Sequence, residues 1–331
     1  MKAIIYARKG GFELVDRPVP EPGPGQVRVK VAVSAVNPTD WKQRSRVDEP
    51  EGEIVPNQDG AGVIDAVGPD TPDRSVGQRV WLWDANWQRP DGTAQEYVVL
   101  PARQAVPLPD GASFELGADL GIPARTAHRA LTLHDNDRLG PGALAGQTVL
   151  VAGGAGAVGN AAIQLAKWAG ATVITTVSSP EKAELARAAG ADHVVNYRTE
   201  DAAAVIGSHA PDGVDIVVEV SPAGNAELDA AVLAPNGVVA VYATDGGDRV
   251  TLPVRSLMWR NIRYEFLLLY TIPEAAKDNA VADVSAAVEA GAFRVGKDAG
   301  LPLHHYPLER TKEAHDAVQG GAVGKVLITL T

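Results

Sequence analysis

The stretch that decides the fold is VLVAGGAGAVGNAAIQLAKWAG, residues 149–170. A short apolar run, TVLVA (148–152), precedes the glycines, and an Ala-rich segment of helical character follows them. The glycines at 154, 156 and 159 satisfy the spacing G-x-G-x-x-G between a strand and a helix, the context in which this motif binds a dinucleotide. The N–H groups at such a helix start bind phosphate. We therefore expect a cofactor site, rather than a plain Gly-rich turn, at Gly153, Gly154, Gly156, Ala157, Val158 and Gly159.

The segments after this turn alternate between strands and helices. TVITTV (172–177), HVVNY (193–197) and DIVVEV (215–220) predict strands, and PEKAELARAAG (180–190) predicts a helix. This alternation is typical of a doubly wound parallel sheet. Before residue 110, short β-branched runs such as QVRVKVAVSAV (26–36) lie between Gly, Pro and Asp, which favours a partly open β-barrel or sandwich. The predicted fold class is α/β, a β-rich domain followed by a Rossmann-like domain, with a C-terminal segment that returns to the first.

The composition excludes several classes of function. At about 150 residues per domain, 331 residues predict two domains. The 30 Lys and Arg against 41 Asp and Glu give a net charge of −11, which does not attract nucleic acid or an anionic membrane. There is no cysteine, which excludes disulfides, thiolate nucleophiles and cysteine-bound zinc or iron–sulfur clusters. We find no secretory leader and no membrane-spanning run, and so expect a soluble cytoplasmic protein.

The end of the second strand of the parallel sheet favours NADPH over NADH. An NAD site requires an Asp or Glu about 20 residues after the glycine motif, but TVITTV is followed by Ser178, Ser179 and Pro180. Without that carboxylate a 2′-phosphate is not repelled, and Ser178 and Lys182 supply a hydrogen-bond donor and a positive charge. The alternative for Lys182 is a solvated position on the helix that follows.

Motifs spread nearly from end to end resemble the zinc-independent quinone oxidoreductases (the zeta-crystallin group) of the medium-chain dehydrogenase/reductase superfamily. They include VNPTDWKQRS (36–45), QDGAGVI (58–64), GTAQEYVVLPA (92–102), GIPARTAHRAL (121–131), AGADHVVNYR (189–198) and GKVLITL (324–330). The resemblance implies a GroES-like domain of residues 1–122 with 266–331, a Rossmann domain of residues 123–265, and a cleft between them for nicotinamide and substrate. It also implies a homodimer joined at the edges of two Rossmann sheets, for which VVAVYA (238–243) and TLPVRSL (251–257) are the candidate edges.

Zinc-dependent relatives provide a test for a metal. They carry a Cys in the stretch that resembles VNPTD and a His–Glu pair in the stretch that resembles QDGAG, where this chain has Gln58 and Asp59. Gln is a poor zinc ligand, and the 7 histidines are scattered. We therefore expect no metal. Direct hydride transfer from NADPH to a quinone or another α,β-unsaturated carbonyl fits best, because an ordinary ketone would need a Lewis acid.

The resemblance also carries catalytic residues over. Asn37 matches the family's active-site asparagine and is expected to donate its amide to the substrate oxygen; the alternative is a turn residue before Pro38. Lys42 stands where many relatives have Tyr, and either donates a proton or charge or faces solvent. Thr126 matches a threonine near the nicotinamide, or else bonds back to a helix carbonyl. Asp40 suits fixing the local turn better than transferring a proton.

Cofactor and substrate contacts follow from the same resemblance. Tyr197 joins the serine and lysine above in the family's 2′-phosphate pocket, Tyr242 is expected near the nicotinamide, and Lys325 near the cofactor phosphates. Tyr197 also suits a core position, and Lys325 a solvated strand start. The candidate substrate pocket consists of Trp41, Trp83, Trp87 and Leu268. The tryptophans also suit the core of their domain.

Two other functions stay open. The same fold and cofactor would serve an enoyl reductase acting on a thioester or a biosynthetic intermediate, for which a long channel rather than a flat slot is expected. A cofactor-binding protein without significant turnover is the other alternative, as the lens crystallins of this group indicate. The leading hypothesis is an NADPH-dependent quinone or enone oxidoreductase with a small-molecule substrate and neither a nucleic-acid nor a membrane partner.

Overall fold

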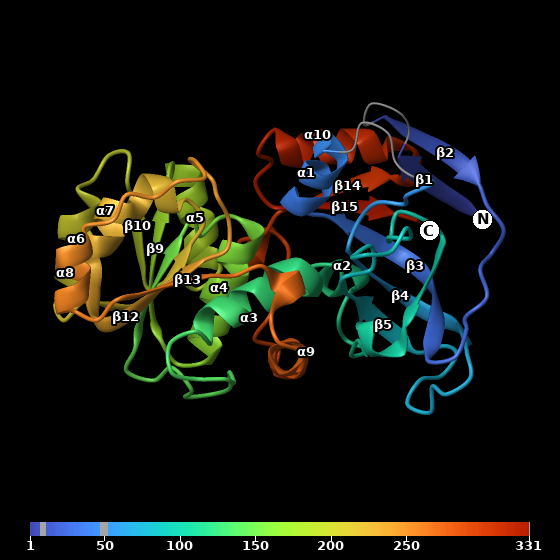
Figure 1. The fold of residues 1–331 in the computed structure, drawn as a ribbon, viewed down its shortest axis with the longest axis horizontal. Helices are drawn as coiled ribbons and strands as arrows, with labels where there is room; N and C mark the ends of the chain where they lie inside the picture. The colour runs from blue at the N-terminus through green and yellow to red at the C-terminus, as the bar shows by residue number, and fades with distance from the viewer. Residues whose placement is uncertain (7–10, 47–51, 331) are drawn as a thin grey trace. The chain divides into compact units, whose positions relative to one another are not determined.

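The computed structural model describes residues 1–6, 11–46 and 52–330, and the chain divides into two compact units. Unit 1 comprises Met1–Ile122 and Leu303–Thr331, and unit 2 comprises Pro123–Pro302. The two ends of the chain, blue and red in Figure 1, therefore belong to the same unit. The chain passes from unit 1 to unit 2 within a π-helical turn, η3 (Leu120–Ala124).

Unit 1 is built on a mostly antiparallel seven-stranded sheet with the order β14-β15-β3-β4-β5-β7, and β6 pairs with β3. Its strands are β3 (Gln26–Val36), β4 (Asp59–Val67), β5 (Arg79–Leu82), β6 (Tyr97–Pro101), β7 (Ala105–Pro107), β14 (Leu303–Pro307) and β15 (Lys325–Thr329). A separate two-stranded sheet consists of β1 (Lys2–Tyr6) and β2 (Phe12–Asp16). Val27, Val29 and Val31 of β3 share one side of the sheet, since alternate residues of a strand face the same way, and they are buried in the core with Ile64 and Leu82.

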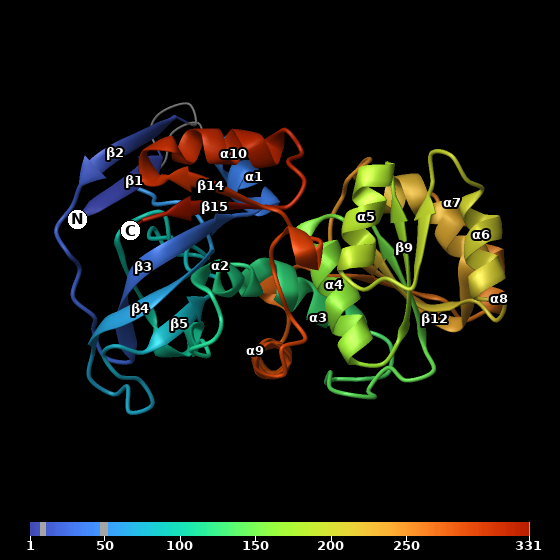
Figure 2. The same ribbon diagram turned by 180° about the vertical axis from the view of Figure 1, so that it is seen from behind.

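The C-terminal segment completes this sheet. Strand β15 pairs with β14 in parallel and with β3 in antiparallel fashion, and Figure 2 shows it between them. The helices of the unit are α1 (Pro38–Arg46), α2 (Phe114–Gly117) and α10 (Thr311–Gln319), with 3-10 turns η2 (Ala102–Gln104) and η6 (Leu308–Arg310). Helix α10 packs on α1 and on β15.

Unit 2 is a parallel six-stranded sheet with the order β10-β9-β8-β11-β12-β13. Its strands are β8 (Thr148–Ala152), β9 (Thr172–Val177), β10 (His193–Asn196), β11 (Val214–Glu219), β12 (Leu233–Val241) and β13 (Arg263–Phe266). Its helical segments are α3 (Arg125–Leu131), α4 (Ala157–Trp168), α5 (Pro180–Ala188), α6 (Ala202–His209), α7 (Pro222–Val232), α8 (Val254–Trp259), η4 (Leu269–Thr271), α9 (Glu274–Glu289) and η5 (Lys297–Ala299). Figure 2 shows helices on both sides of the sheet. The strand order reverses between β8 and β11, the position at which doubly wound sheets bind ligands beyond the carboxyl ends of their strands.

The expected α/β class is confirmed, but two details differ from the sequence-based expectation. The return to unit 1 begins at Leu303 rather than at residue 266. The reason is that β13 hydrogen-bonds to β12 in the parallel sheet and α9 packs against α3 and α4. The segment VVAVYA is also no sheet edge, because its strand β12 is paired on both sides. The segment TLPVRSL is not an edge strand either, because it ends within helix α8. The open edges of this sheet are β10 and β13.

Candidate cofactor and active site

The glycine turn connects β8 to α4 and keeps one position open. Gly153 has a φ of 73°, in the left-handed region that glycine adopts readily. A Cβ on Gly154 would lie 2.2 Å from the Thr175 hydroxyl oxygen, and a Cβ on Gly159 would lie 2.4 Å from the Gly153 carbonyl oxygen. At Gly156, the N-cap of α4, the nearest atom to a Cβ would be that same carbonyl oxygen, 3.5 Å away. Packing therefore requires the first and third glycines of the motif, whereas a Cβ at the second would make only an ordinary van der Waals contact.

The first turn of α4 provides N–H groups for an anion. The N–H groups of the three glycines before the helix are already used, two of them by the Thr176 carbonyl of β9 and one by the Gly153 carbonyl. Those of Ala157, Val158 and Gly159 begin the helix and have no acceptor inside it. Ala157 and Val158 are only half-buried. A helix start with partial positive charge, beside a glycine that leaves space, fits a pyrophosphate group.

A serine, a lysine and a tyrosine lie together at the carboxyl ends of β9 and β10. The last residues of the two strands, Val177 and Asn196, are register partners, and the Tyr197 N–H donates to the Val177 carbonyl over 3.1 Å. Beyond them, the Lys182 Nζ donates to the Ser178 Oγ over 3.1 Å. Tyr197 is 52% exposed, so it is not a core residue. The structure thus brings these three predicted residues to one end of the sheet, where Lys182 supplies a positive charge.

A further group of residues lies at the carboxyl ends of β11 and β12. The half-buried Tyr242 donates its backbone N–H to the Glu219 carbonyl over 3.1 Å. Burial raises the pKa of the Tyr242 phenol, and the charges on Glu219 and Asp245 raise it further, so Tyr242 is a neutral hydrogen-bonding group. Glu219 and Asp229 are buried, and burial together with the neighbouring Glu219 carboxylate raises the pKa of Asp229 well above its ordinary value. Sequence reasoning missed this acid pair.

In unit 1, the Asn37 carboxamide is held at both of its polar atoms. Its Nδ2 donates to the Asp59 Oδ2 over 2.7 Å, and its Oδ1 accepts from the Lys325 Nζ over 2.8 Å. The Asp59 Oδ2 also accepts the Ile122 N–H over 2.8 Å, and the Lys325 Nζ lies 3.4 Å from the Asp119 Oδ1. All four side chains of this polar cluster, Asn37, Asp59, Asp119 and Lys325, are at most 2% exposed. The side chain of Asn37 is thus not a turn cap for its own backbone.

The position of Lys325 rules out the solvated alternative. Lys325 begins β15 and is buried inside unit 1, because Asp119 and the Asn37 oxygen provide the partners that a buried ammonium requires. Its position near the cofactor phosphates stays a prediction.

Asp40 fixes the start of α1. Its Oδ2 accepts the Asn37 backbone N–H over 2.7 Å, and its own N–H donates to the Asn37 carbonyl over 3.0 Å. Burial raises the pKa of Asp40 to about 8, of Asp119 to about 7 and of Asp59 to about 6, in each case in spite of the nearby Lys325 ammonium. Asp40 therefore keeps a proton at neutral pH that an ordinary aspartate would have lost.

The other predicted catalytic residues occupy varied environments. Lys42 and Trp41, both half-buried, lie on α1 with the Lys42 Nζ 5.8 Å from the centre of the Trp41 ring. Thr126 lies on α3 in unit 2 and is 5% exposed.

The four residues of the candidate substrate pocket do not share one environment. Trp83 is 2% exposed and the Arg103 guanidinium lies over its ring, 5.4 Å from the centre, so its burial favours a core role. Trp41 and Trp87 are half-buried, and Leu268 is 53% exposed in unit 2.

The residues around Gln58 are not arranged for a metal. The Gln58 Oε1 accepts the Asn86 N–H over 3.0 Å, and the neighbouring Asp59 is bound to Asn37 as described above. Within residues 1–6, 11–46 and 52–330, the structure contains no group of three or more His, Cys, Asp or Glu side chains placed to hold a metal ion.

Comparison with known proteins decides the family. Residues 23–110 match the alcohol dehydrogenase GroES-like domain, and residues 157–286 match the zinc-binding dehydrogenase family. The chain is 30% identical over 341 aligned residues to the quinone oxidoreductase of Lama guanicoe, covering 100% of this chain and 98% of that protein. The chain belongs to the quinone oxidoreductase-type medium-chain dehydrogenases/reductases. It is accordingly an oxidoreductase, with a GroES-like unit 1 and a Rossmann-type unit 2.

Other relatives of this medium-chain dehydrogenase/reductase carry different names. A 2-haloacrylate reductase of a Burkholderia species is 32% identical over 263 residues, covering 77% of this chain and 76% of that protein. The rat synaptic vesicle membrane protein VAT-1 homolog is 32% identical over 265 residues, but this chain spans only 62% of its length. Among solved structures, the quinone oxidoreductase of Thermus thermophilus, studied also as its NADPH complex, matches with a TM-score of 0.80 at 27% identity, covering 100% of both chains.

No helix among the described residues of this oxidoreductase is long and apolar enough to cross a membrane.

Sequence reasoning missed how the buried polar residues of unit 1 converge. A signal was present, because Asp119 interrupts an apolar run and Asp59 begins a buried strand, and a carboxyl in such a place is seldom buried without a partner. Their convergence on Lys325 could not be predicted from the sequence, because Asp119 and Lys325 lie 206 positions apart in the chain.

Proposed function

We propose that this chain is an NADPH-dependent, zinc-independent oxidoreductase that transfers hydride to a quinone or another α,β-unsaturated carbonyl. The observation that carries the cofactor choice is the 3.1 Å contact between the Lys182 Nζ and the Ser178 Oγ at the end of β9. A 2′-phosphate placed there would meet an ammonium and a hydroxyl, both of which bind phosphate well. The exposed Tyr197 adds a phenol at the same end of the sheet.

The glycine turn supports binding of the rest of the dinucleotide. Gly156 leaves space at the start of α4, and the N–H groups of Ala157 and Val158 point their partial charge at an anion there. Further along the sheet, Tyr242 at the end of β12 and Thr126 of α3 are proposed to contact the nicotinamide.

The chain's own residues bind and orient the substrate. When bound, NADPH supplies a hydride from C4 of its nicotinamide. Asn37 donates a Nδ2 N–H to the substrate carbonyl oxygen, where negative charge develops as the hydride arrives. A conjugated carbonyl delocalises that charge onto its oxygen, so a hydrogen-bond donor is sufficient and the Lewis acid of a zinc enzyme is not required. Gln58, a poor zinc ligand that is already bound to the Asn86 backbone, supports this route.

An activated carbon–carbon double bond is a second candidate acceptor. The similarity to a 2-haloacrylate reductase favours it, because that substrate class has an alkene conjugated with a carboxyl group. The same Asn37 donor would serve either acceptor.

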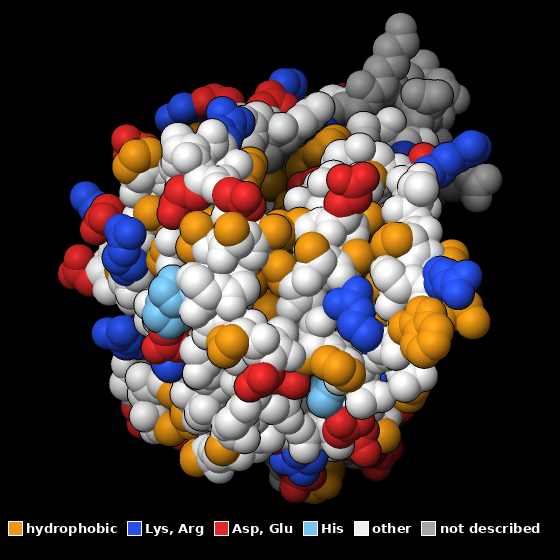
Figure 3. Space-filling view, turned by 90° about the vertical axis from the view of Figure 1, so that its left-hand side faces the viewer, with side chains coloured by type: hydrophobic (Ala, Val, Ile, Leu, Met, Phe, Trp, Pro, Cys, Tyr) orange, Lys and Arg blue, Asp and Glu red, His pale blue; other side chains and the backbone are white. Residues whose placement is uncertain are grey.

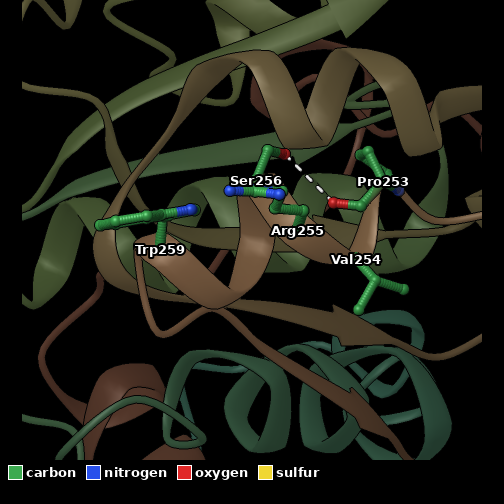
Figure 4. A pocket seen from close by; sticks show the side chains of 5 residues that line it. All are labelled: Pro253, Val254, Arg255, Ser256 and Trp259. Carbon is green, nitrogen blue, oxygen red and sulfur yellow. Dashed lines mark hydrogen bonds between the residues drawn. The ribbon is translucent and has the colours of Figure 1, made fainter.

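The same proposal includes a homodimer formed through β13 of unit 2. Among the residues that the structure describes, β13 pairs with β12 alone, so the other edge of its backbone is open there. Exposed apolar side chains accompany the edge strand and the helix before it: Val254 is 62%, Met258 71%, Trp259 77% and Phe266 69% exposed. A shallow hollow of about 560 Å³ lies at this helix. Figure 4 shows the side chains that line it, which are Pro253, Val254, Arg255, Ser256 and Trp259. Figure 3 shows apolar side chains, in orange, between charged ones on one face of the molecule.

NADPH oxidation followed at 340 nm tests the function. We expect turnover with quinones or enones that is faster with NADPH than with NADH and that survives a strong chelator. Loss of activity on chelation would contradict the zinc-independent route. Cofactor binding without oxidation across a panel of quinones, enones and haloacrylates would favour a protein without turnover.

A further inference from the structure

Lys325 is a buried ammonium with two kinds of partner. It lies at the start of β15, 2% exposed, with its Nζ 3.4 Å from the Asp119 Oδ1 and 2.8 Å from the Asn37 Oδ1. Burying a charge costs several kcal/mol unless it is paired. Asp119 supplies the opposite charge, and the neutral carboxamide of Asn37 supplies only a hydrogen bond. The second contact therefore calls for an explanation beyond charge neutralisation.

Lys325 and Asp59 together determine which way the Asn37 carboxamide faces. An ammonium only donates hydrogen bonds, so the atom that faces Lys325 must be the Asn37 oxygen. The Asp59 Oδ2 lies 2.7 Å from the Asn37 Nδ2 and also accepts the Ile122 N–H. A flipped amide would direct its N–H groups at an ammonium and its oxygen at a carboxylate, which is repulsive at both ends.

Asp59 is itself held in place. Gly121 approaches it so closely that a Cβ at residue 121 would lie 2.0 Å from the Asp59 Oδ1. This close approach and the hydrogen bond from the Ile122 N–H hold the Asp59 carboxylate in place. The Asp59 carboxylate in turn holds the Asn37 amide.

We propose that Lys325 and Asp59 are positioning residues that hold the Asn37 carboxamide in one orientation, with its second Nδ2 hydrogen kept for the substrate carbonyl oxygen. This inference rests on the proposed function, in which Asn37 is the donor. Lys325 has an additional effect, because a positive charge on the amide oxygen polarises the group and makes its N–H a stronger donor. The C-terminal strand of unit 1 thereby contributes to catalysis through Asn37 rather than through the cofactor.

A double-mutant cycle tests the inference. In the wild-type background, Lys325→Met should lower kcat for a quinone by about 100-fold, as expected for loss of an oriented donor. The Kd for NADPH should change less than about 3-fold. Lys325→Arg should recover part of the lost kcat. In an Asn37→Ala background, Lys325→Met should change kcat little further. Multiplicative losses in the double variant, or an unchanged kcat in the single one, would overturn the proposal.

Arg44→Met is the matched control for removal of a buried cation. Arg44 also lies in unit 1, is 8% exposed and pairs with Asp316 over 3.1 Å on helix α10. Any effect of Arg44→Met on kcat should be the same with Asn37 and with Ala at position 37.

Two additional measurements cover loss of folding and loss of function. If Lys325→Met does not fold, Lys325→Met with Asp119→Asn removes one positive and one negative charge together and takes its place in the cycle. Nuclear magnetic resonance of selectively ¹⁵N-Asn-labelled protein needs no turnover. The Asn37 side-chain amide should exchange slowly with solvent in wild type and at least about 10-fold faster in Asp59→Asn. Equal exchange rates would overturn the positioning role, whereas protection without any quinone turnover would overturn only the proposed function.

Discussion

The Lys325 ammonium donates a hydrogen bond to the Asn37 carboxamide oxygen over 2.8 Å, and both side chains are buried. The contact joins the two ends of the chain, because β15 lies against β3, whose last residue precedes Asn37. The oxygen of the amide is thus occupied by a permanent donor, and the group faces any ligand as an N–H donor.

Replacing Asn37 should affect turnover rather than cofactor binding. We expect Asn37→Ala to lower kcat for a quinone by about 100-fold, because one donor to a developing oxyanion contributes about that much, and to leave the Kd for NADPH within about 2-fold. Asn37→Asp, which has the same shape but offers an acceptor, should be at least as impaired. Steady-state kinetics with fluorescence titration of NADPH measure both quantities. A rise in KM alone, with kcat intact, would assign Asn37 to ground-state binding.

Lys182 should discriminate between the two nicotinamide cofactors. Its Nζ contacts the Ser178 Oγ, so Lys182→Ala removes the charge that a 2′-phosphate would meet. We expect the Kd for NADPH to rise about 10- to 100-fold, equivalent to about 1.4–2.8 kcal/mol, and the Kd for NADH to change less than 2-fold.

Arg187→Ala is the control for this substitution. Arg187 lies on the same helix α5 but pairs with the exposed Glu184. Arg187→Ala therefore removes an equal charge and leaves the contact at Ser178 in place. An equal loss for NADPH in both variants would attribute the effect to net charge instead of a specific pocket.

The glycines of the turn should separate binding from stability. Ala at Gly156 meets no atom closer than 3.5 Å, so Gly156→Ala should keep the melting temperature and raise the Kd for NADPH at least about 10-fold by filling the space beside the pyrophosphate. Ala at Gly159 would lie 2.4 Å from the Gly153 carbonyl oxygen, and this overpacking should cost about 1–3 kcal/mol of stability. Thermal melts and titrations of both variants check the contrast. A destabilised Gly156→Ala would mean that this position also serves packing.

The parallel sheet was predictable because its signals are local. The strand–glycine–helix pattern at 149–170 and the strand at 172–177 predict elements that β8, α4 and β9 confirm. The course of the chain near residue 266 was not predictable from the sequence. A short strand such as β13 can be assigned only once the strand to which it hydrogen-bonds is known. The burial of Lys325 was not predictable for a related reason. Its sequence shows a polar residue before an apolar strand, which predicts solvent exposure unless the acids of other segments are known to meet it.

Substitution at the β13 edge tests the homodimer. Phe266 is 69% and Trp259 77% exposed, and both are near the open strand edge in sequence. Phe266→Lys with Trp259→Lys should convert a dimer to a monomer, because charges in an apolar interface are costly to bury. Light scattering after size-exclusion chromatography measures the mass. Val76→Lys, at a 62% exposed position of unit 1, is the control and should leave the mass unchanged. A wild-type monomer would exclude the dimer at once.

The pH dependence of stability should reveal the buried Asp40. Burial raises its pKa to about 8, whereas the unfolded chain has the ordinary value of 3.8. Between these two values the folded chain holds a proton that the unfolded chain releases, so stability falls as pH rises, by up to about 1.4 kcal/mol per pH unit. Asp40→Asn carries no proton to lose, and its Oδ1 can still accept the Asn37 N–H. The variant should therefore gain stability relative to wild type as pH rises from 5 to 8, as measured by urea unfolding.

Asp283 provides a control of opposite sign for this pH series. Although burial opposes it, hydrogen bonds from His128 and Arg138 lower the pKa of Asp283 to about 2. The contribution of Asp283 to the free energy of unfolding is fully present above 3.8, the pKa of this carboxyl in the unfolded chain. It is lost only as pH falls toward 2. Asp283→Asn should therefore show a constant loss of stability between pH 7 and 8, above the pKa of the neighbouring His128, which burial lowers from 6.5, while the Asp40→Asn difference still changes there. A constant difference for Asp40→Asn as well would mean that Asp40 is ionised in the folded protein, so that the Lys325 ammonium faces more negative charge than the raised pKa values imply.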